Sequence, residues 1–238
     1  MMPSTVLDPT LSQTLSAAGK SGYRLVIGNK NYSSWSMRAW LVLKAFGIPF
    51  EEVRIPLGQP DSANRIGQFS LAGRVPVLIA GDVSVWDSLA ICEFLAEQFP
   101  DRGMWPGDVN ARAMARSICA EMHSGLSGLR SAMWMNIRAS FPGKGRTPEA
   151  QSDISRICEI WETCLEQGGP KDFLFGDFSI ADAYFAPMVM RFRTYNVWMA
   201  PALQSYMDRV IAHPAVQQWM REAIEEPERM PQYDSYPD

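Results

Sequence analysis

The pattern of apolar residues in the first part of the chain predicts strands separated by helices. Residues 23–28 form a short apolar run, and residues 50–55 alternate apolar and charged side chains, so both segments predict strands. Between them, residues 36–47 place apolar side chains at helical spacing and end in a glycine, which predicts a helix. Residues 56–73 are rich in Gly, Pro, Asn and Ser, and predict only a short helix.

A hairpin and a second clear helix follow. Residues 75–80 and 83–86 are short strands around Gly81-Asp82, which is a strong signal for a tight turn. Asp87 then caps an amphipathic segment that ends near Phe99. A crossover connection followed by a hairpin predicts a four-stranded mixed sheet with helices packed on it.

Beyond residue 100 the pattern is helical throughout. Helical spacing runs from Asn110 to about Ser140, resumes over 149–167, and starts again at Ile180, at Pro201 and over 214–225. The chain therefore predicts an α+β sheet domain followed by an all-helical one. We expect a flexible N-terminal extension over 1–22, the sheet domain over 23–99, a linker over 100–109, the all-helical domain over 110–226 and a loosely held tail over 227–238.

The composition mainly argues against certain classes of protein. The 238 residues are 47% apolar and 20% charged, which is ordinary for a globular protein, and the net charge of −4 gives no bias toward nucleic acid or anionic membrane. No apolar run is long enough to span a bilayer, and the first residues lack the pattern of a secretory signal. We expect a cytoplasmic protein without nucleic-acid or membrane partners.

Metal and histidine chemistry are poorly supported by the sequence. Four cysteines are scattered without metal-ligand spacing, and each lies among apolar residues, where free cysteine behaves as a small buried hydrophobe. Only two histidines occur, and His213 stands before Pro214 at a helix boundary. We therefore interpret His123, His213 and the cysteines as structural, and expect no metal site.

The segment Asn31-Tyr32-Ser33-Ser34-Trp35-Ser36-Met37-Arg38 lies between a predicted strand and a predicted helix. Unpaired N–H groups and the helix dipole favour negative charge at such a helix start, so the serine hydroxyls could hold a thiolate or carboxylate. A plain N-cap serine is the commoner role and is favoured on this segment alone. Arg38 either adds positive potential or forms a surface ion pair.

Two further pairs also lie at helix starts. Ser88 and the backbone N–H groups after Asp87 can hold a carboxylate while Asp87 pairs with an ammonium, although an N-cap role for Asp87 fits equally. Ser179 and Asp182 have the spacing of a capping box, and we assign that pair to folding.

From residue 23 to about 225 the chain resembles the soluble glutathione S-transferases. The resemblance depends on four ordered motifs rather than on one. They are Ser33-Ser34-Trp35-Ser36-Met37-Arg38, similar to the SSCSxR segment of the zeta class; Arg74-Val75-Pro76-Val77-Leu78; Asp87-Ser88-Leu89-Ala90-Ile91; and Phe178-Ser179-Ile180-Ala181-Asp182.

The resemblance implies a thioredoxin-like first domain that binds glutathione as co-substrate. It implies a cis bond before Pro76 and pairing of the Val75 backbone with the cysteinyl part of glutathione. Ser33, which aligns with the first zeta serine, is the expected partner of the thiolate and Ser34 is the alternative; Tyr32 is disfavoured by its position before them. The implied glutathione-binding residues are Ser33, Ser34, Trp35, Arg74, Val75, Pro76, Asp87 and Ser88.

The resemblance also implies an activity, attack of the glutathione thiolate on an electrophile bound against the helical domain. Candidates for an apolar electrophile site are Met133, Trp134, Phe141, Trp198 and Met199, although such residues are more often core. Trp35 stands where the zeta segment has cysteine, which argues against thiol chemistry of the loop itself. A zeta-type isomerase resembling maleylacetoacetate isomerase and a non-catalytic binding protein are the alternatives, and a homodimer is implied.

Overall fold

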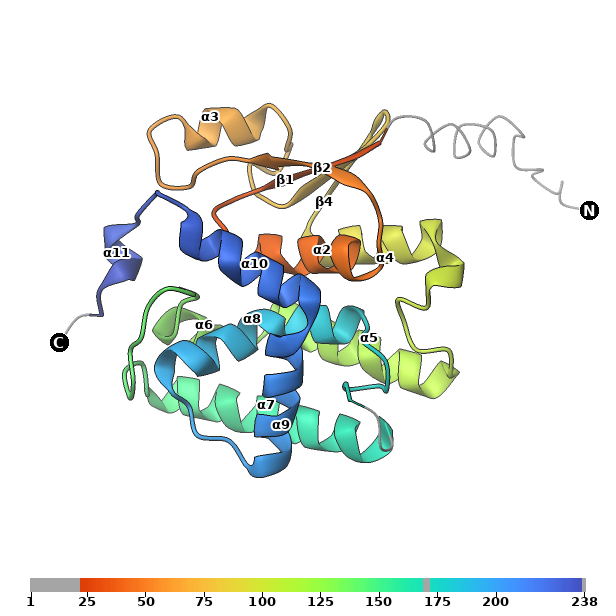
Figure 1. Ribbon diagram of the computed structural model, residues 1–238, viewed down its shortest axis with the longest axis vertical. Helices are drawn as coiled ribbons and strands as arrows, with labels where there is room; N and C mark the ends of the chain where they lie inside the picture. Colours follow the sequence, from red (N-terminus) through yellow and green to blue (C-terminus); the bar gives the residue numbers. More distant parts are fainter. Residues whose placement is uncertain (1–21, 169–171, 237–238) are drawn as a thin grey trace, which may run out of the picture.

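The computed structural model describes residues 22–168 and 172–236. The expected extension over 1–22 lies almost wholly outside the described residues. A sheet forms one layer of the molecule and helices fill the rest (Figure 1).

The sheet has four strands, β1 (Tyr23–Ile27), β2 (Phe50–Arg54), β3 (Val77–Ala80) and β4 (Val83–Trp86), in the order β2-β1-β3-β4. β1 and β2 are parallel, whereas β1 with β3 and β3 with β4 are antiparallel. The parallel pair is the result of the crossover and the antiparallel pair is the result of the hairpin, so the predicted mixed sheet is confirmed.

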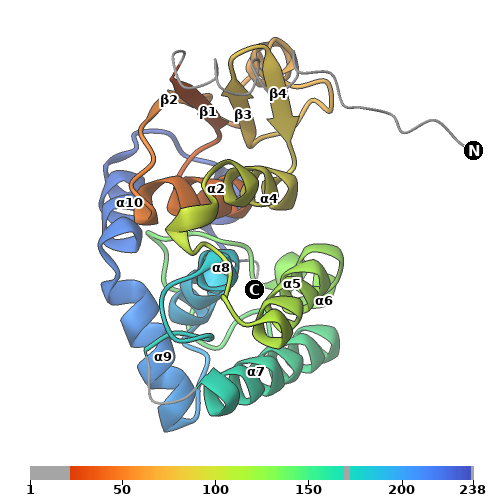
Figure 2. The same cartoon turned by 90° about the vertical axis from the view of Figure 1, so that its right-hand side faces the viewer.

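Helices cover both faces of the sheet. α2 (Ser34–Ala45) and α4 (Ser88–Gln98) lie between the sheet and the helical half, whereas α3 (Ser62–Gly67) lies on the outer face (Figures 1 and 2). Val26, Ile66 and Val77 form the small core under α3, and Leu25, Trp40 and Ile91 belong to the main core. Alternating strand residues thus serve two cores, as their period of two requires.

The second half is helical in all its described residues, apart from connecting segments and one isolated bridge between Phe173 and Gly176. The predicted fold class is therefore confirmed. α8 is buried along nearly its whole length and packs against α2 of the sheet domain. The elements are η1 (Pro100–Arg102), α5 (Val109–Ser124), α6 (Ser127–Ala132), α7 (Pro148–Gly168), α8 (Ile180–Tyr195), α9 (Pro201–Ala212), α10 (Pro214–Glu225) and α11 (Pro231–Asp234).

The single helix expected from Asn110 to about Ser140 is wrong. α5 ends at Ser124, and Leu126 takes a left-handed conformation with φ of 55° before the short α6 begins. The apolar spacing continues across this break because both helices contribute to the same core, so periodicity alone did not reveal the interruption. Gly125 was the local signal.

The Ser179–Asp182 capping box is present at the start of α8. Asp182 Oδ2 accepts the Ser179 backbone N–H at 2.9 Å, while the Ser179 hydroxyl oxygen accepts from Ala181. The expected buried cysteines are confirmed for Cys92, Cys119 and Cys164, and Cys158 is half-buried. No helix within residues 22–168 and 172–236 is long and apolar enough to cross a membrane.

Candidate functional site

Ser33 is the N-cap of α2, and its hydroxyl is committed to the loop. Its Oγ accepts the Ser36 N–H at 3.4 Å and donates to Ser36 Oγ at 2.7 Å. Ser36 Oγ also accepts the Gly28 N–H at 3.1 Å, which ties the start of α2 to the end of β1. Ser33 is therefore the serine that caps the helix, and Ser36 lies inside its first turn.

Ser34, in contrast, retains a hydroxyl hydrogen. Its Oγ accepts a hydrogen bond of 3.3 Å from Arg191 of α8, and no described side chain or backbone group accepts from it. Arg191 is 4% exposed, and burial together with repulsion from Arg38 and Arg130 lowers its pKa to about 9. A buried cation thus stands behind the Ser34 hydroxyl, and the hydroxyl remains free to donate into the space in front of it.

Arg38 is fully buried, so the surface ion pair considered from the sequence is wrong. Its guanidinium donates to the backbone carbonyls of Ser34 and Tyr184 at 3.0 Å and packs over the rings of Trp35 and Tyr184. Burial lowers its pKa to about 10. The positive charge therefore lies inside the molecule beside the first turn of α2.

The start of α4 provides the second polar end of the site. Asp87 takes a φ of 73°, and its Oδ1 accepts the N–H groups of Leu89 at 2.8 Å and Ala90 at 3.3 Å. Positive φ is costly for a residue with a Cβ, and such conformations gather at functional sites. Asp87 is thus the N-cap, and its Oδ2 is not engaged by α4.

Val75 lies between these two helix starts. The Val75–Pro76 peptide bond is cis, as the resemblance implied. Among the described residues, no backbone hydrogen bond outside regular elements involves Val75. Its N–H and C=O are consequently available to an extended ligand, in the manner of strand pairing.

Two adjoining cavities connect these features. The first, of about 600 Å³, includes Pro76, Asp87, Ser88 and His123 in its lining, and the second, of about 640 Å³, includes Ser33, Ser34, Arg191, Trp134 and Met230. The two share Trp35, Arg74, Val75 and Arg130. One elongated ligand can therefore reach from Asp87 to Ser34, and every glutathione-binding residue expected from the sequence lines one or both cavities.

Tyr32 has its hydroxyl fully occupied. The oxygen accepts from Arg138 Nη2 at 2.9 Å and from the Met230 N–H at 3.1 Å, and the hydroxyl donates to Asp234 Oδ1 at 2.6 Å. Burial, followed by the Asp234 carboxylate, raises its pKa. Tyr32 lines the second cavity, but its hydroxyl hydrogen is already donated to Asp234 and is not left for a ligand.

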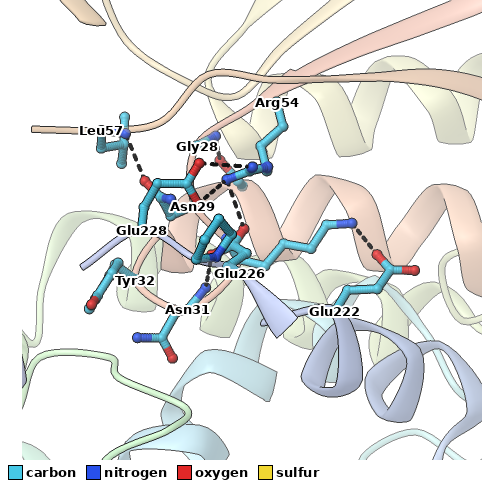
Figure 3. Close-up of polar contacts among 12 residues, drawn as sticks. Gly28, Asn29, Asn31, Tyr32, Arg54, Leu57, Glu222, Glu226 and Glu228 are labelled. Atoms are coloured by element: carbon cyan, nitrogen blue, oxygen red, sulfur yellow. Dashed lines mark hydrogen bonds and ion pairs between the residues drawn. The ribbon is translucent and has the colours of Figure 1, made fainter. Parts of the chain in front are cut away.

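The C-terminal segment after α10 is bound to the loop between β1 and α2, residues 28–33, which we call the serine loop. The expectation of a loosely held tail is therefore wrong for residues 227–236. Buried Glu226 accepts the backbone N–H groups of Lys30 at 2.6 Å and Asn31 at 3.2 Å, and Arg54 of β2 makes a two-pronged pair with Glu228 (Figure 3). Because the segment covers the loop from outside, it forms one wall of the second cavity through Met230 and Tyr233.

The candidate electrophile residues are dispersed. Trp134 lines the second cavity, and Phe141 packs against it with ring centroids 6.3 Å apart. Met133 and Met199 are buried in the core, and Trp198 is 80% exposed and lies outside both cavities. Arg130, Arg191 and Met230 belong to the cavities and were not predicted. Arg130 and Arg191 lie in helices whose apolar pattern does not mark a cavity, and Met230 lies in the segment that was expected to be a loosely held tail.

Comparisons with known proteins agree on one family. Family models described as the N-terminal and C-terminal domains of glutathione S-transferase match residues 32–98 and 144–222. The maleylacetoacetate isomerase of Rattus norvegicus is 28% identical over 171 residues, or 71% of this chain and 77% of that one. A probable maleylacetoacetate isomerase of Caenorhabditis elegans is 26% identical over 172 residues, covering 71% and 78% of the two chains.

A solved structure gives the same result. A glutathione transferase homologue from Burkholderia, determined with bound glutathione, is 26% identical with a TM-score of 0.68, and the similarity covers 87% of this chain and 100% of that one. The fold is that of a thioredoxin-like sheet domain followed by a helical domain, and residues of both line the two cavities. The chain belongs to the glutathione S-transferase family.

Proposed function

We propose that this protein is a glutathione transferase that binds glutathione across the two cavities and stabilises its thiolate with a serine hydroxyl. The supporting observation is the Ser34 hydroxyl, which has a free hydrogen, a buried guanidinium behind it and a place at the cavity. A thiol with an ordinary pKa near about 8.5 is mostly protonated at neutral pH, so the site must favour the charged form.

We infer that Ser34 rather than Ser33 donates to the sulfur. The Ser33 hydrogen is directed to Ser36 Oγ within the loop, whereas Ser34 donates to nothing in the described residues and is polarised by Arg191. Ser33, as N-cap, orients the first turn of α2 and its dipole toward the same place. Both serines therefore contribute, one as the donor and the other through the helix start.

The remaining groups fit the rest of the tripeptide. Ser88 and the N-terminus of α4 would hold the γ-glutamyl carboxylate, the second oxygen of Asp87 would face its ammonium, and Val75 would pair with the cysteinyl backbone. Arg74 and Arg130 supply positive charge at the junction of the cavities. An electrophile would then bind in the second cavity between Trp134 and Met230.

Spectroscopic titration of the thiol of bound glutathione tests this function in wild type, Ser33→Ala and Ser34→Ala. We expect a lowered thiol pKa in wild type and a thiol pKa raised by about 1 unit in Ser34→Ala, since a hydrogen bond to a charged group contributes about 1.5 kcal/mol or more. A thiol pKa in the wild type equal to that of free glutathione would contradict the thiolate mechanism. Glutathione-independent ligand binding with no turnover would indicate the non-catalytic alternative.

A zeta-type cis-trans isomerase is the second candidate, favoured by the names of the curated relatives. In the zeta-like segment this chain has Trp35, with its ring over Arg38, where a cysteine stands in that class. Parallel assays with maleylacetoacetate and with chlorodinitrobenzene separate the two activities. Turnover of the first alone would establish the isomerase.

We also propose a homodimer, with the sheet domain of one subunit against the helical domain of the other. Leu71, Val83 and Trp86 expose apolar side chains on the sheet domain, which supports an interface there. Sedimentation equilibrium gives the mass directly. A monomer at micromolar concentration would contradict the proposal.

A further inference from the structure

His123 of α5, in the helical domain, lies close to the two residues at the start of α4, Asp87 and Ser88. Its Nε2 lies 3.2 Å from Asp87 Oδ2, and its Nδ1 lies 2.7 Å from the hydroxyl oxygen of Tyr184. That hydroxyl in turn lies 3.0 Å from Ser88 Oγ. Asp87 and Ser88 are adjacent in sequence, yet one ion-pair contact, from Asp87 to His123, and two hydrogen bonds, from His123 to Tyr184 and from Tyr184 to Ser88, also link their side chains.

The direction of this chain depends on the protonation of His123. A carboxylate only accepts, so the tautomer with its hydrogen on Nε2 is the one that suits the 3.2 Å contact with Asp87 Oδ2. In the neutral imidazole Nδ1 must then accept from the Tyr184 hydroxyl, and the Tyr184 oxygen can accept only from Ser88. The Ser88 hydrogen is consequently turned away from the cavity and toward Tyr184.

A second proton on the imidazole reverses the direction of hydrogen-bond donation from Ser88 through Tyr184 to His123. Nδ1–H then donates to the Tyr184 oxygen, and the Tyr184 hydroxyl donates to Ser88 Oγ. The Ser88 hydrogen becomes free to donate to a carboxylate in the first cavity, which Ser88 lines. Ser88 is only 1% exposed, so few alternative partners exist for its hydrogen.

We propose that His123 is a positioning residue for the γ-glutamyl carboxylate of glutathione, because its protonation sets, through Tyr184, whether Ser88 can donate to that carboxylate. The proposal rests on the function proposed above and adds to it a residue from the helical domain. Binding of the carboxylate and protonation of His123 then favour each other, as linkage requires.

Other charged groups face His123 from the neighbouring helices. Asp87 faces it from α4, Tyr184 from α8, and Arg130 of α6 donates to its backbone carbonyl at 3.4 Å. Arg38 of α2 lies beyond, with its guanidinium 4.9 Å from the centroid of the Tyr184 ring. Burial raises the pKa of Tyr184. Of these side-chain types only an imidazole ordinarily changes charge between about pH 5 and about pH 8.

The test is calorimetric binding of S-methylglutathione from about pH 5.5 to about pH 8, the range in which imidazoles titrate. This probe has no ionisable thiol, so thiol ionisation does not contribute to the pH profile. We expect wild-type affinity to fall about tenfold as pH rises, the equivalent of one hydrogen bond to a charged group. Tyr184→Phe retains the imidazole and its charge but removes the hydroxyl that links His123 to Ser88. In this variant we expect affinity to change little with pH.

Two more variants complete the test, each checked for folding by denaturant unfolding. His123→Gln and Ser88→Ala should both bind weakly and with little dependence on pH. A wild-type profile without pH dependence, or an equally steep profile in Tyr184→Phe, would overturn the proposal while leaving the proposed function intact. No binding by the wild type at any pH would instead contradict the proposed function itself.

Discussion

Arg191 donates a hydrogen bond of 3.3 Å to Ser34 Oγ, and the two side chains come from opposite halves of the chain. Arg191 also donates to the backbone carbonyls of Met133 and Pro187, and none of these acceptors carries a negative charge. A buried cation that has no carboxylate partner among the described residues is costly, and the charge of Arg191 lies beside the Ser34 hydroxyl. An anion bound at Ser34 would supply the missing charge.

We therefore expect Arg191→Met to raise the thiol pKa of bound glutathione and to lower kcat/KM about tenfold, the loss of one charge-assisted interaction. Arg191→Lys should retain part of the effect because it keeps the charge. Stopped-flow and steady-state kinetics measure both quantities. Arg193→Met, an exposed position on the same helix, is the matched control. Equal kinetics in Arg191→Met and Arg193→Met would remove Arg191 from the mechanism.

Glu226→Gln should loosen the serine loop. One carboxylate oxygen would become an NH₂ group facing the backbone N–H of Lys30 or Asn31, leaving a buried donor unsatisfied. We expect the free energy of unfolding to fall by about 1–3 kcal/mol and glutathione affinity to fall with it. Denaturant unfolding and calorimetry measure the two effects. Glu225→Gln, on the exposed neighbour, should change neither, and similar losses in both variants would contradict a role for Glu226 in the loop.

Asp182 predicts a pH dependence of stability. Burial raises its pKa to about 6 in the folded protein, against about 3.9 in an unfolded chain. The folded protein thus holds a proton that the unfolded chain has lost, so this contribution to stability is present below about pH 4 and is lost as pH rises through about 6.

The expected loss from this group is about 3 kcal/mol between those limits, from about 1.4 kcal/mol for each pKa unit. Unfolding free energies of wild type and Asp182→Asn across this range test it, because the asparagine does not titrate. Asp208→Asn, on an exposed carboxylate of α9, is the control. A constant difference between wild type and Asp182→Asn at all pH values would show that Asp182 does not titrate in this range.

At neutral pH, Asp182→Ala should lower the free energy of unfolding by about 1 kcal/mol or more through loss of the capping box.

Substitution of Met230 should affect binding of the electrophile and binding of glutathione differently. It lines the second cavity and not the first, so Met230→Ala should weaken binding of a large apolar electrophile without altering KM for glutathione. A loss of about tenfold in kcat/KM for that electrophile corresponds to removal of a few buried carbon atoms. Arg229→Ala, at the exposed neighbouring position, is the control. An equal change in both KM values would show that Met230 supports the whole loop.

Local sequence accounted for the elements that begin or end with specific residues. Gly81-Asp82 gave the β3–β4 turn, Asp87 gave the start of α4, and Ser179 with Asp182 gave the start of α8. These features depend on side chains within three or four residues of the backbone groups they satisfy. The break at Gly125 and Leu126 was missed because burial in one core continues the apolar spacing on both sides of it.

The sequence by itself determined the mixed sheet and the helical second half, because local periodicity and capping mark their elements. It also placed the three segments that line the cavities between those elements, namely the serine loop, Val75-Pro76 and Asp87-Ser88. Only the tertiary structure decided that the Ser34 hydroxyl has a buried guanidinium behind it, since that group belongs to Arg191, 157 residues away. It likewise decided that Glu226 closes the serine loop and that His123 lies between Asp87 and Tyr184. Contacts between residues far apart in the chain are set by packing, and no local pattern encodes them.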